Sequence, residues 1–228
     1  MATTRLDNAV SNAGSLTLAF GAVSAGNDRV LIVMVGEEEG DQIHPDGCTY
    51  GDQSMTEIVQ EIVPDTFGSI TFYGLNEAGI SAASGTTVTV SFPTTRSPNP
   101  GEIQIHAATY QDADQTTPWS KTISDGSSDP PNPITTVDVN ADADTVVVSG
   151  VFFGDSGTTS WGADLTEQTD QNDASSASSM ADAEISSAGN VDCEGTFSGG
   201  EANRISAASF QIGVAVGNPS GYWGLRVA

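Results

Sequence analysis

Two uninterrupted apolar runs constrain the fold more than any other feature of this sequence. RVLIVMVG occupies residues 29–36, and TVVVSGVFF occupies residues 145–153. A strand with one face in water alternates apolar and polar residues, whereas a strand covered on both faces is apolar throughout. Neither run approaches the ~20 apolar residues that a membrane span needs. We therefore expect both runs to form buried strands and no segment to span a membrane.

Further segments have the short alternating or apolar pattern of strands, and Gly, Pro, Asn and Asp separate them. They span residues 15–20, 55–63, 69–75, 86–92, 103–110, 135–139, 165–169, 176–185, 191–198 and 204–216. No segment carries a sustained helical stripe of apolar residues. About twelve strands with turns between them predict an all-β fold, an antiparallel β-sandwich of the jelly-roll or immunoglobulin-like kind.

The order of landmarks in the first part of the chain recurs in the second. Tyr50-Gly51 corresponds to Trp161-Gly162, and a Thr-Glu pair follows each. A small-residue strand then ends in an aromatic residue, Tyr110 or Phe210. These landmarks predict one unit over residues 1–228, made of two related halves at 1–123 and 134–228, on either side of SDGSSDPPNP at 124–133. Two alternatives stay open: the likeness of any two antiparallel strand sets, and two small separate domains.

The charge of the chain is strongly one-sided. Thirty acidic residues stand against six basic ones, and the formal net charge is -24. Such a charge repels itself unless salt screens it, and the Debye length falls to roughly 3 Å at molar ionic strength. We interpret the composition as that of a halophile; an ordinary acidic extracellular or phage protein is the alternative. Binding to nucleic acid is disfavoured, because carboxylates would face phosphates.

The side chains that commonly carry catalysis are few. His44 lies in an acidic loop, and His106 lies in an apolar strand, where a histidine is usually packed and hydrogen-bonded. The sequence has no GxSxG, HExxH or phosphate-binding glycine loop, so we expect no enzymatic activity. Cys48 and Cys193 allow at most one disulfide, and we expect two separate thiols. The start of the chain lacks the basic and apolar regions of a signal peptide.

Acidic clusters suggest a divalent-cation site, although solvated carboxylates are the simpler explanation for any one of them. Calcium binds carboxylate and carbonyl oxygens in loops. Alternate residues of an extended segment share a face, so two Asp-x-Asp pairs are the best candidates. They are Asp112 with Asp114 and Asp142 with Asp144. Ca²⁺, Mg²⁺ or Na⁺ are the ions we would expect there, and we expect no other cofactor.

The succession RVLIVMVGEEEG, TYGDQSMTE, TVTVSF and AATYQDADQTTPW resembles β-sandwich virion proteins of tailed viruses. Their pattern runs from an apolar strand to a YGG-x-x-[ML]-T turn and an S-G-V-D-Q-T-T-P turn. The match is partial, because YQDADQTTP carries Asp and Ala where small residues are usual. It covers residues 29–119 directly and the remainder through the repeat.

This resemblance, with the acidic composition, implies a non-enzymatic structural protein on the extracellular surface of a halophilic archaeal virus particle. A capsid turret, decoration, spike or tail component would fit. The implied partners are other virion proteins and further copies of the chain in a homo-oligomer. The alternative is a module that binds carbohydrate or adheres to the host, with a host surface glycan as ligand. The terminal PSGYWGLRVA is relatively apolar and could close a sheet or dock on a neighbouring subunit.

Overall fold

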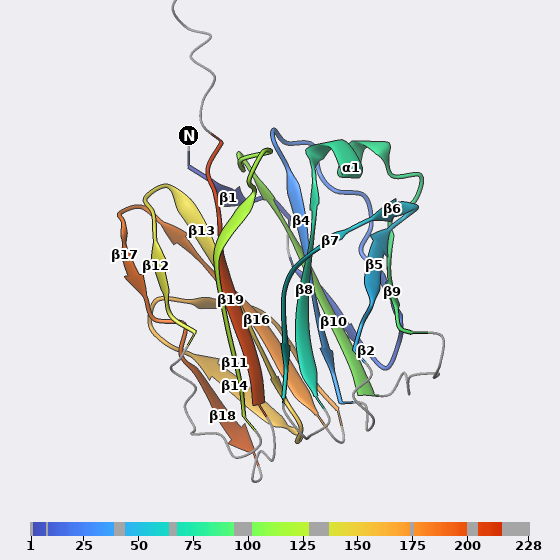
Figure 1. Cartoon of the computed structure of the whole chain (residues 1–228), viewed down its shortest axis with the longest axis vertical. Helices are drawn as coiled ribbons and strands as arrows, with labels where there is room; N and C mark the ends of the chain where they lie inside the picture. Colours follow the sequence, from blue (N-terminus) through green and yellow to red (C-terminus); the bar gives the residue numbers. More distant parts are fainter. Residues whose placement is uncertain are drawn as a thin grey trace, which may run out of the picture.

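The chain folds into an all-β structure of stacked antiparallel sheets (Figure 1), as the sequence predicts. The structure is a computed structural model. It describes residues 2–7, 9–38, 44–63, 68–93, 102–127, 137–173, 176–199 and 205–215. The terminal segment 216–228 therefore lies outside the described residues.

Two large sheets form the centre of the molecule. The first main sheet has the order β1-β10-β4-β8-β7, with β2 also paired to β10. Its strands are β1 (Thr4–Arg5), β2 (Val10–Ala13), β4 (Val30–Glu37), β7 (Thr56–Ile62), β8 (Ser69–Asn76) and β10 (Ile103–Gln111). The second main sheet has the order β11-β19-β13-β16-β15. Its strands are β11 (Trp119–Ser127), β13 (Thr145–Phe153), β15 (Thr166–Asn172), β16 (Ala177–Ile185) and β19 (Ile205–Ile212).

Smaller sheets cover the outer faces of the two main sheets. The first outer sheet has the order β3-β9-β5-β6, and the second outer layer consists of the hairpin pairs β12-β17 and β14-β18. The strands are β3 (Thr17–Ala19), β5 (Gly47–Tyr50), β6 (Gln53–Ser54), β9 (Thr87–Ser91), β12 (Val139–Ala141), β14 (Gly157–Trp161), β17 (Gly189–Val191) and β18 (Gly195–Gly199). One helix, α1 (Glu77–Ala82), follows β8. Figure 1 shows the outer sheets on opposite sides of the main pair.

Three apolar cores separate the four layers, and this explains the two apolar runs. In β4, Val30, Ile32 and Met34 belong to the core between the main sheets, while the intervening side chains belong to the core under the first outer sheet. β13 alternates in the same way between the central core and the core under the second outer layer. Every residue of both strands is buried. The prediction of strands covered on both faces is confirmed.

The main sheets of the two halves have the same topology. β4, β7, β8 and β10 of the first sheet occupy the positions of β13, β15, β16 and β19 in the second. Even an irregularity recurs: the register shifts between Glu57 and Val59 in β7, and between Glu167 and Thr169 in β15. Each shift directly follows the Thr-Glu pair that marks the repeat. The Thr-Glu pairs therefore mark equivalent structural positions.

Two features differ from the sequence predictions. The described residues contain nineteen strands rather than about twelve, because strands of two to five residues, such as β5, β6 and β14, carry too little alternation to be recognised. β11 continues to Ser127 and pairs with β19. The change from one main sheet to the other therefore precedes Trp119, earlier than the predicted end of the first half at residue 123.

Two glycines allow the main sheets to approach closely. A Cβ atom on Gly150 of β13 would lie 2.3 Å from Met34 Sδ and 2.6 Å from Phe72 Cζ, both in the opposite sheet. A Cβ atom on Gly36 of β4 would lie 2.4 Å from Phe152 Cδ2. Real side chains do not pack at such distances, so any larger residue would force these facing side chains, or the sheets that carry them, to move.

We therefore expect Gly150→Ala to lower the free energy of unfolding by about 1–3 kcal/mol, the usual cost of overpacking a core. Urea unfolding at constant salt measures it. Gly189→Ala is the matched control, because a Cβ atom there would contact nothing within 4 Å. Equal stability of the two variants would contradict the close contact between the sheets.

Candidate functional site

A hydrogen-bonded chain of polar side chains crosses the core between the main sheets. His106 of β10 is completely buried. Its Nδ1 lies 2.7 Å from Thr169 Oγ1 and its Nε2 lies 2.6 Å from Ser178 Oγ, both in the second main sheet. The Ser178 hydroxyl donates in turn to Gln104 Oε1. The prediction of a packed, hydrogen-bonded His106 is confirmed.

These contacts determine the proton arrangement of the imidazole. Ser178 uses its one hydroxyl hydrogen on Gln104, so its oxygen must accept from His106 Nε2–H. Burial lowers the pKa of His106 to about 3, so the ring is neutral at higher pH and Nδ1 accepts from the Thr169 hydroxyl. A catalytic triad places a carboxylate at that second nitrogen and exposes the serine to substrate. Here a hydroxyl takes that place and both Ser178 and His106 are buried, so the arrangement joins two sheets.

A second group of polar contacts, centred on Asp182, joins the same two main sheets. The Tyr110 hydroxyl donates to Asp182 Oδ2 at 3.0 Å, and Gln168 Nε2 donates to Asp182 Oδ1 at 2.8 Å. Arg5 Nη1 lies 3.6 Å from the same carboxylate. Burial raises the pKa of Asp182, and the charge of Arg5 opposes that effect. Asp182 and the buried Glu37 of β4 show that carboxylates occur inside strands, not only in turns.

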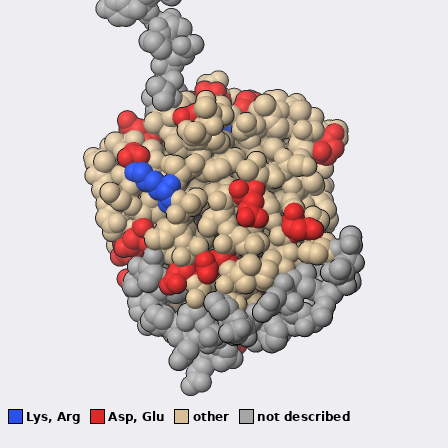
Figure 2. All heavy atoms as spheres, in the orientation of Figure 1, with Lys and Arg blue, Asp and Glu red and all other residues tan. Residues whose placement is uncertain are grey.

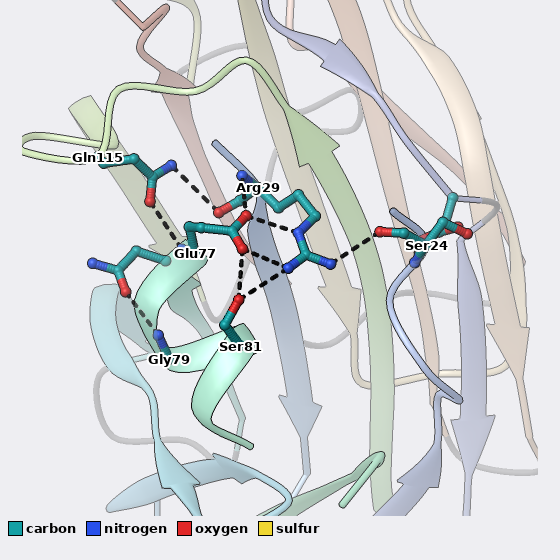
Figure 3. Close-up of polar contacts among 8 residues, drawn as sticks. Ser24, Arg29, Glu77, Gly79, Ser81 and Gln115 are labelled. Atoms are coloured by element: carbon teal, nitrogen blue, oxygen red, sulfur yellow. Dashed lines mark hydrogen bonds and ion pairs between the residues drawn. The ribbon is translucent and has the colours of Figure 1, made fainter. Parts of the chain in front are cut away.

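A third network fastens the end of the first main sheet (Figure 3). Arg29 Nε donates to Glu77 Oε2 at 2.7 Å, and its Nη2 reaches both Glu77 Oε1 and Ser81 Oγ of α1. Gln115 Oε1 accepts from the Glu77 backbone N–H at 2.8 Å. Hydrogen bonding to Arg29 lowers the pKa of Glu77 to about 2. The network thus ties the start of β4, α1 and the loop after β10 together.

The DADQTTP segment that contributes to the resemblance is the loop in this network. Asp114 Oδ1 accepts from the backbone N–H groups of Thr116 and Thr117, at 2.7 and 3.3 Å. Gln115 carries the contact to α1. The residues of this motif therefore hold a turn in shape.

The four aspartates proposed as cation ligands serve mostly other contacts. Asp142 Oδ1 lies 2.8 Å from Lys121 Nζ. Asp112 and Asp144 have φ values of +58° and +63° and accept hydrogen bonds from Thr3 through their backbone carbonyls. Asp114 fastens its own loop. Across the part of the chain that the structure describes, no three His, Cys, Asp or Glu residues group as metal ligands.

Both cysteines are free and buried, as expected, and they lie in different cores. Within the described ranges, the structure has no helix long and apolar enough to cross a membrane. The buried partners Ser178 and Asp182 and the half-buried Thr169 were not predicted from the sequence. For Ser178 and Asp182 the only signal is a polar residue at an inward position of β16, whose other residues are mostly small or apolar, whereas Thr169 lies in the polar strand β15 and gives no such signal.

No protein family, curated protein or solved structure matches the chain. The fold and these networks define an all-β protein of four layers, whose two main sheets are joined by buried polar contacts.

The neutral state of His106 predicts a specific pH dependence of stability. In the unfolded chain a histidine takes up a proton near pH 6.5, whereas folded His106 does so only near pH 3. The unfolded state therefore binds the extra proton between these values, and stability falls as the pH falls from about 6.5 to about 3, by up to about 1.4 kcal/mol per pH unit.

His106→Gln should remove this slope, because glutamine keeps a donor and an acceptor but does not titrate in this range. Urea unfolding across the pH series measures the difference between variant and wild type. His44→Gln, the control, leaves the His106 contribution in place. A slope that is the same in wild type and His106→Gln would show that His106 is not buried as a neutral ring.

The cation site stays a prediction. Calcium titration calorimetry on the wild type, on D112N/D114N and on D142N/D144N tests it. Heat that disappears in one double variant would assign the ion to that pair. Equal heats in all three proteins would exclude both pairs.

Proposed function

We propose that the chain is a non-enzymatic structural protein on the outer surface of a halophilic virus particle, such as a turret, decoration, spike or tail component. The observation that carries the proposal is that the imidazole and thiol side chains named above are buried in the fold. His106 joins the main sheets, and both thiols are buried in separate cores. The imidazole and the two thiols are therefore part of the packed interior of the β structure.

The charge distribution supports a salt-rich environment. The three basic residues that the structure describes, Arg5, Arg29 and Lys121, each form an ion pair within the chain. Figure 2 shows carboxylates spread over one face with few basic atoms among them. The remaining negative charge is left to be balanced by solvent cations, which concentrated salt supplies.

The proposal predicts that stability rises with salt. The melting temperature should increase as KCl is raised from about 0.1 M to about 1 M, because the Debye length falls from roughly 10 Å to roughly 3 Å. Differential scanning calorimetry measures it. Sucrose at matched osmolality is the control, since it strengthens burial without screening charge. An equal rise in sucrose and in KCl would contradict a role for screening.

The structural role itself is tested on particles. Mass spectrometry of purified virions from the culture that makes the chain should find it as a stoichiometric component. Light scattering in molar KCl should find a closed homo-oligomer, which dissociates at low salt. A strict monomer that is absent from virions would refute the proposal.

A further inference from the structure

The two halves differ at the ends of the equivalent strands β8 and β16. In the first half, α1 follows β8, and its Ile80 is buried in the core under the first outer sheet. In the second half, a turn of three residues leads from β16 to β17. Asn76, the N-cap of α1, pairs with Val30, and Glu184 pairs with Val146 at the equivalent position. Glu184 thus stands where a helix begins in the other half.

A cavity of about 250 Å³ opens at this end of the second half. Its lining combines the carboxylates of Asp164 and Glu184 with hydroxyl and amide groups and with the apolar side chains of Ile185 and Val191. Small-molecule sites usually measure about 300–1,000 Å³, so the size suits a protein side chain better than a free ligand. The carboxylates and apolar side chains together suit a cationic side chain flanked by apolar ones.

The chain itself contains such a segment. Residues 216–228, VGNPSGYWGLRVA, have no acidic residue, although thirty occur in the whole chain. Arg226 stands between Leu225 and Val227. The segment is therefore complementary to the cavity in charge and in apolar character.

The described structure ends beside the cavity. The Thr3 hydroxyl donates to the Gly213 carbonyl at 3.2 Å, and the Ala215 N–H donates to the Asp112 carbonyl. Thr3 also lines a smaller adjoining cavity of about 180 Å³, which shares Glu184, Ile185 and Ser186 with the larger one. From Ala215 an extended chain could carry Arg226 over roughly 36 Å at most, so the length of the segment is sufficient for Arg226 to reach the cavity.

We propose that this cavity is the docking site for residues 216–228 of the same chain. In the docked state that we propose, the carboxylates of Asp164 and Glu184 would receive Arg226, and Ile185 and Val191 would receive its apolar neighbours. The segment would occupy in the second half the position that α1 occupies in the first. This inference goes beyond the proposed structural role and does not depend on it.

Disulfide trapping in the full-length chain tests the proposal. Leu225→Cys is combined with Ser187→Cys at the cavity. The matched control combines it with Ser84→Cys, an exposed serine that follows α1 in the first half. Docking predicts a cross-link within one chain that forms at least about tenfold faster with Ser187→Cys, because docking raises the effective concentration. Peptide mapping identifies the linked cysteines.

Variants that remove the charges test whether the carboxylates of the cavity recognise Arg226. Adding D164N/E184Q or Arg226→Gln should slow the cross-link about fivefold at low salt, the scale of a partly exposed ion pair. Equal cross-linking rates at Ser187→Cys and Ser84→Cys would overturn the proposal. A cross-linking rate that is the same with and without the charge substitutions would overturn it as well. A cross-linked dimer would place the segment on a neighbouring copy and would also overturn it. Salt-dependent oligomerisation is measured separately, so its failure is distinguishable from failure here.

Discussion

The burial of β4 and β13 on both faces is the constraint on which the remaining structure depends. A strand that is apolar throughout must be covered twice, and each half alone has one outer layer to offer. The second cover comes from the other half, so the two main sheets pack face to face around Met34, Phe72, Phe152 and Phe210. Gly36 and Gly150 bring the sheets within packing distance. The four-layer order follows from this single requirement.

Polar contacts across the central core give that packing a definite register. Apolar surfaces alone allow sheets to slide, whereas a buried donor or acceptor must find its partner or lose roughly 1–3 kcal/mol. His106 meets Thr169 and Ser178, and Tyr110 meets Asp182, so each pair fixes one sheet against the other. Glu37 and Asp182 are the buried acidic residues of the described part of the chain. The others are at least partly exposed, some in turns and others in edge strands, such as Glu57 of β7 and Glu167 of β15. Salt therefore screens the charges at the surface, while the buried polar contacts maintain the packing of the two main sheets.

The sequence predicted the parts of the fold that have a strong periodic signal. Each of its twelve strand segments overlaps a strand of the structure, and the Thr-Glu landmarks mark equivalent register shifts. It missed β11, whose polar residues and bulge at Lys121 hide the pattern, and α1, six residues held by Arg29 rather than by an apolar stripe. The buried network escaped because pairing between distant strands, such as His106 with Ser178, leaves no local trace. The Asp-x-Asp pairs are locally visible, but folding gives Asp114 and Asp142 other partners.

Native-state hydrogen exchange tests the central account most directly, since it reports the stability of each strand separately. If each main sheet supplies the second cover of the other, the amides of β4 and β13 exchange only through global unfolding. Both strands then show the same free energy of opening, equal to that from urea unfolding. If β4 and β13 instead open with clearly different free energies, the halves are independent sandwiches, and the shared central core does not hold the molecule together.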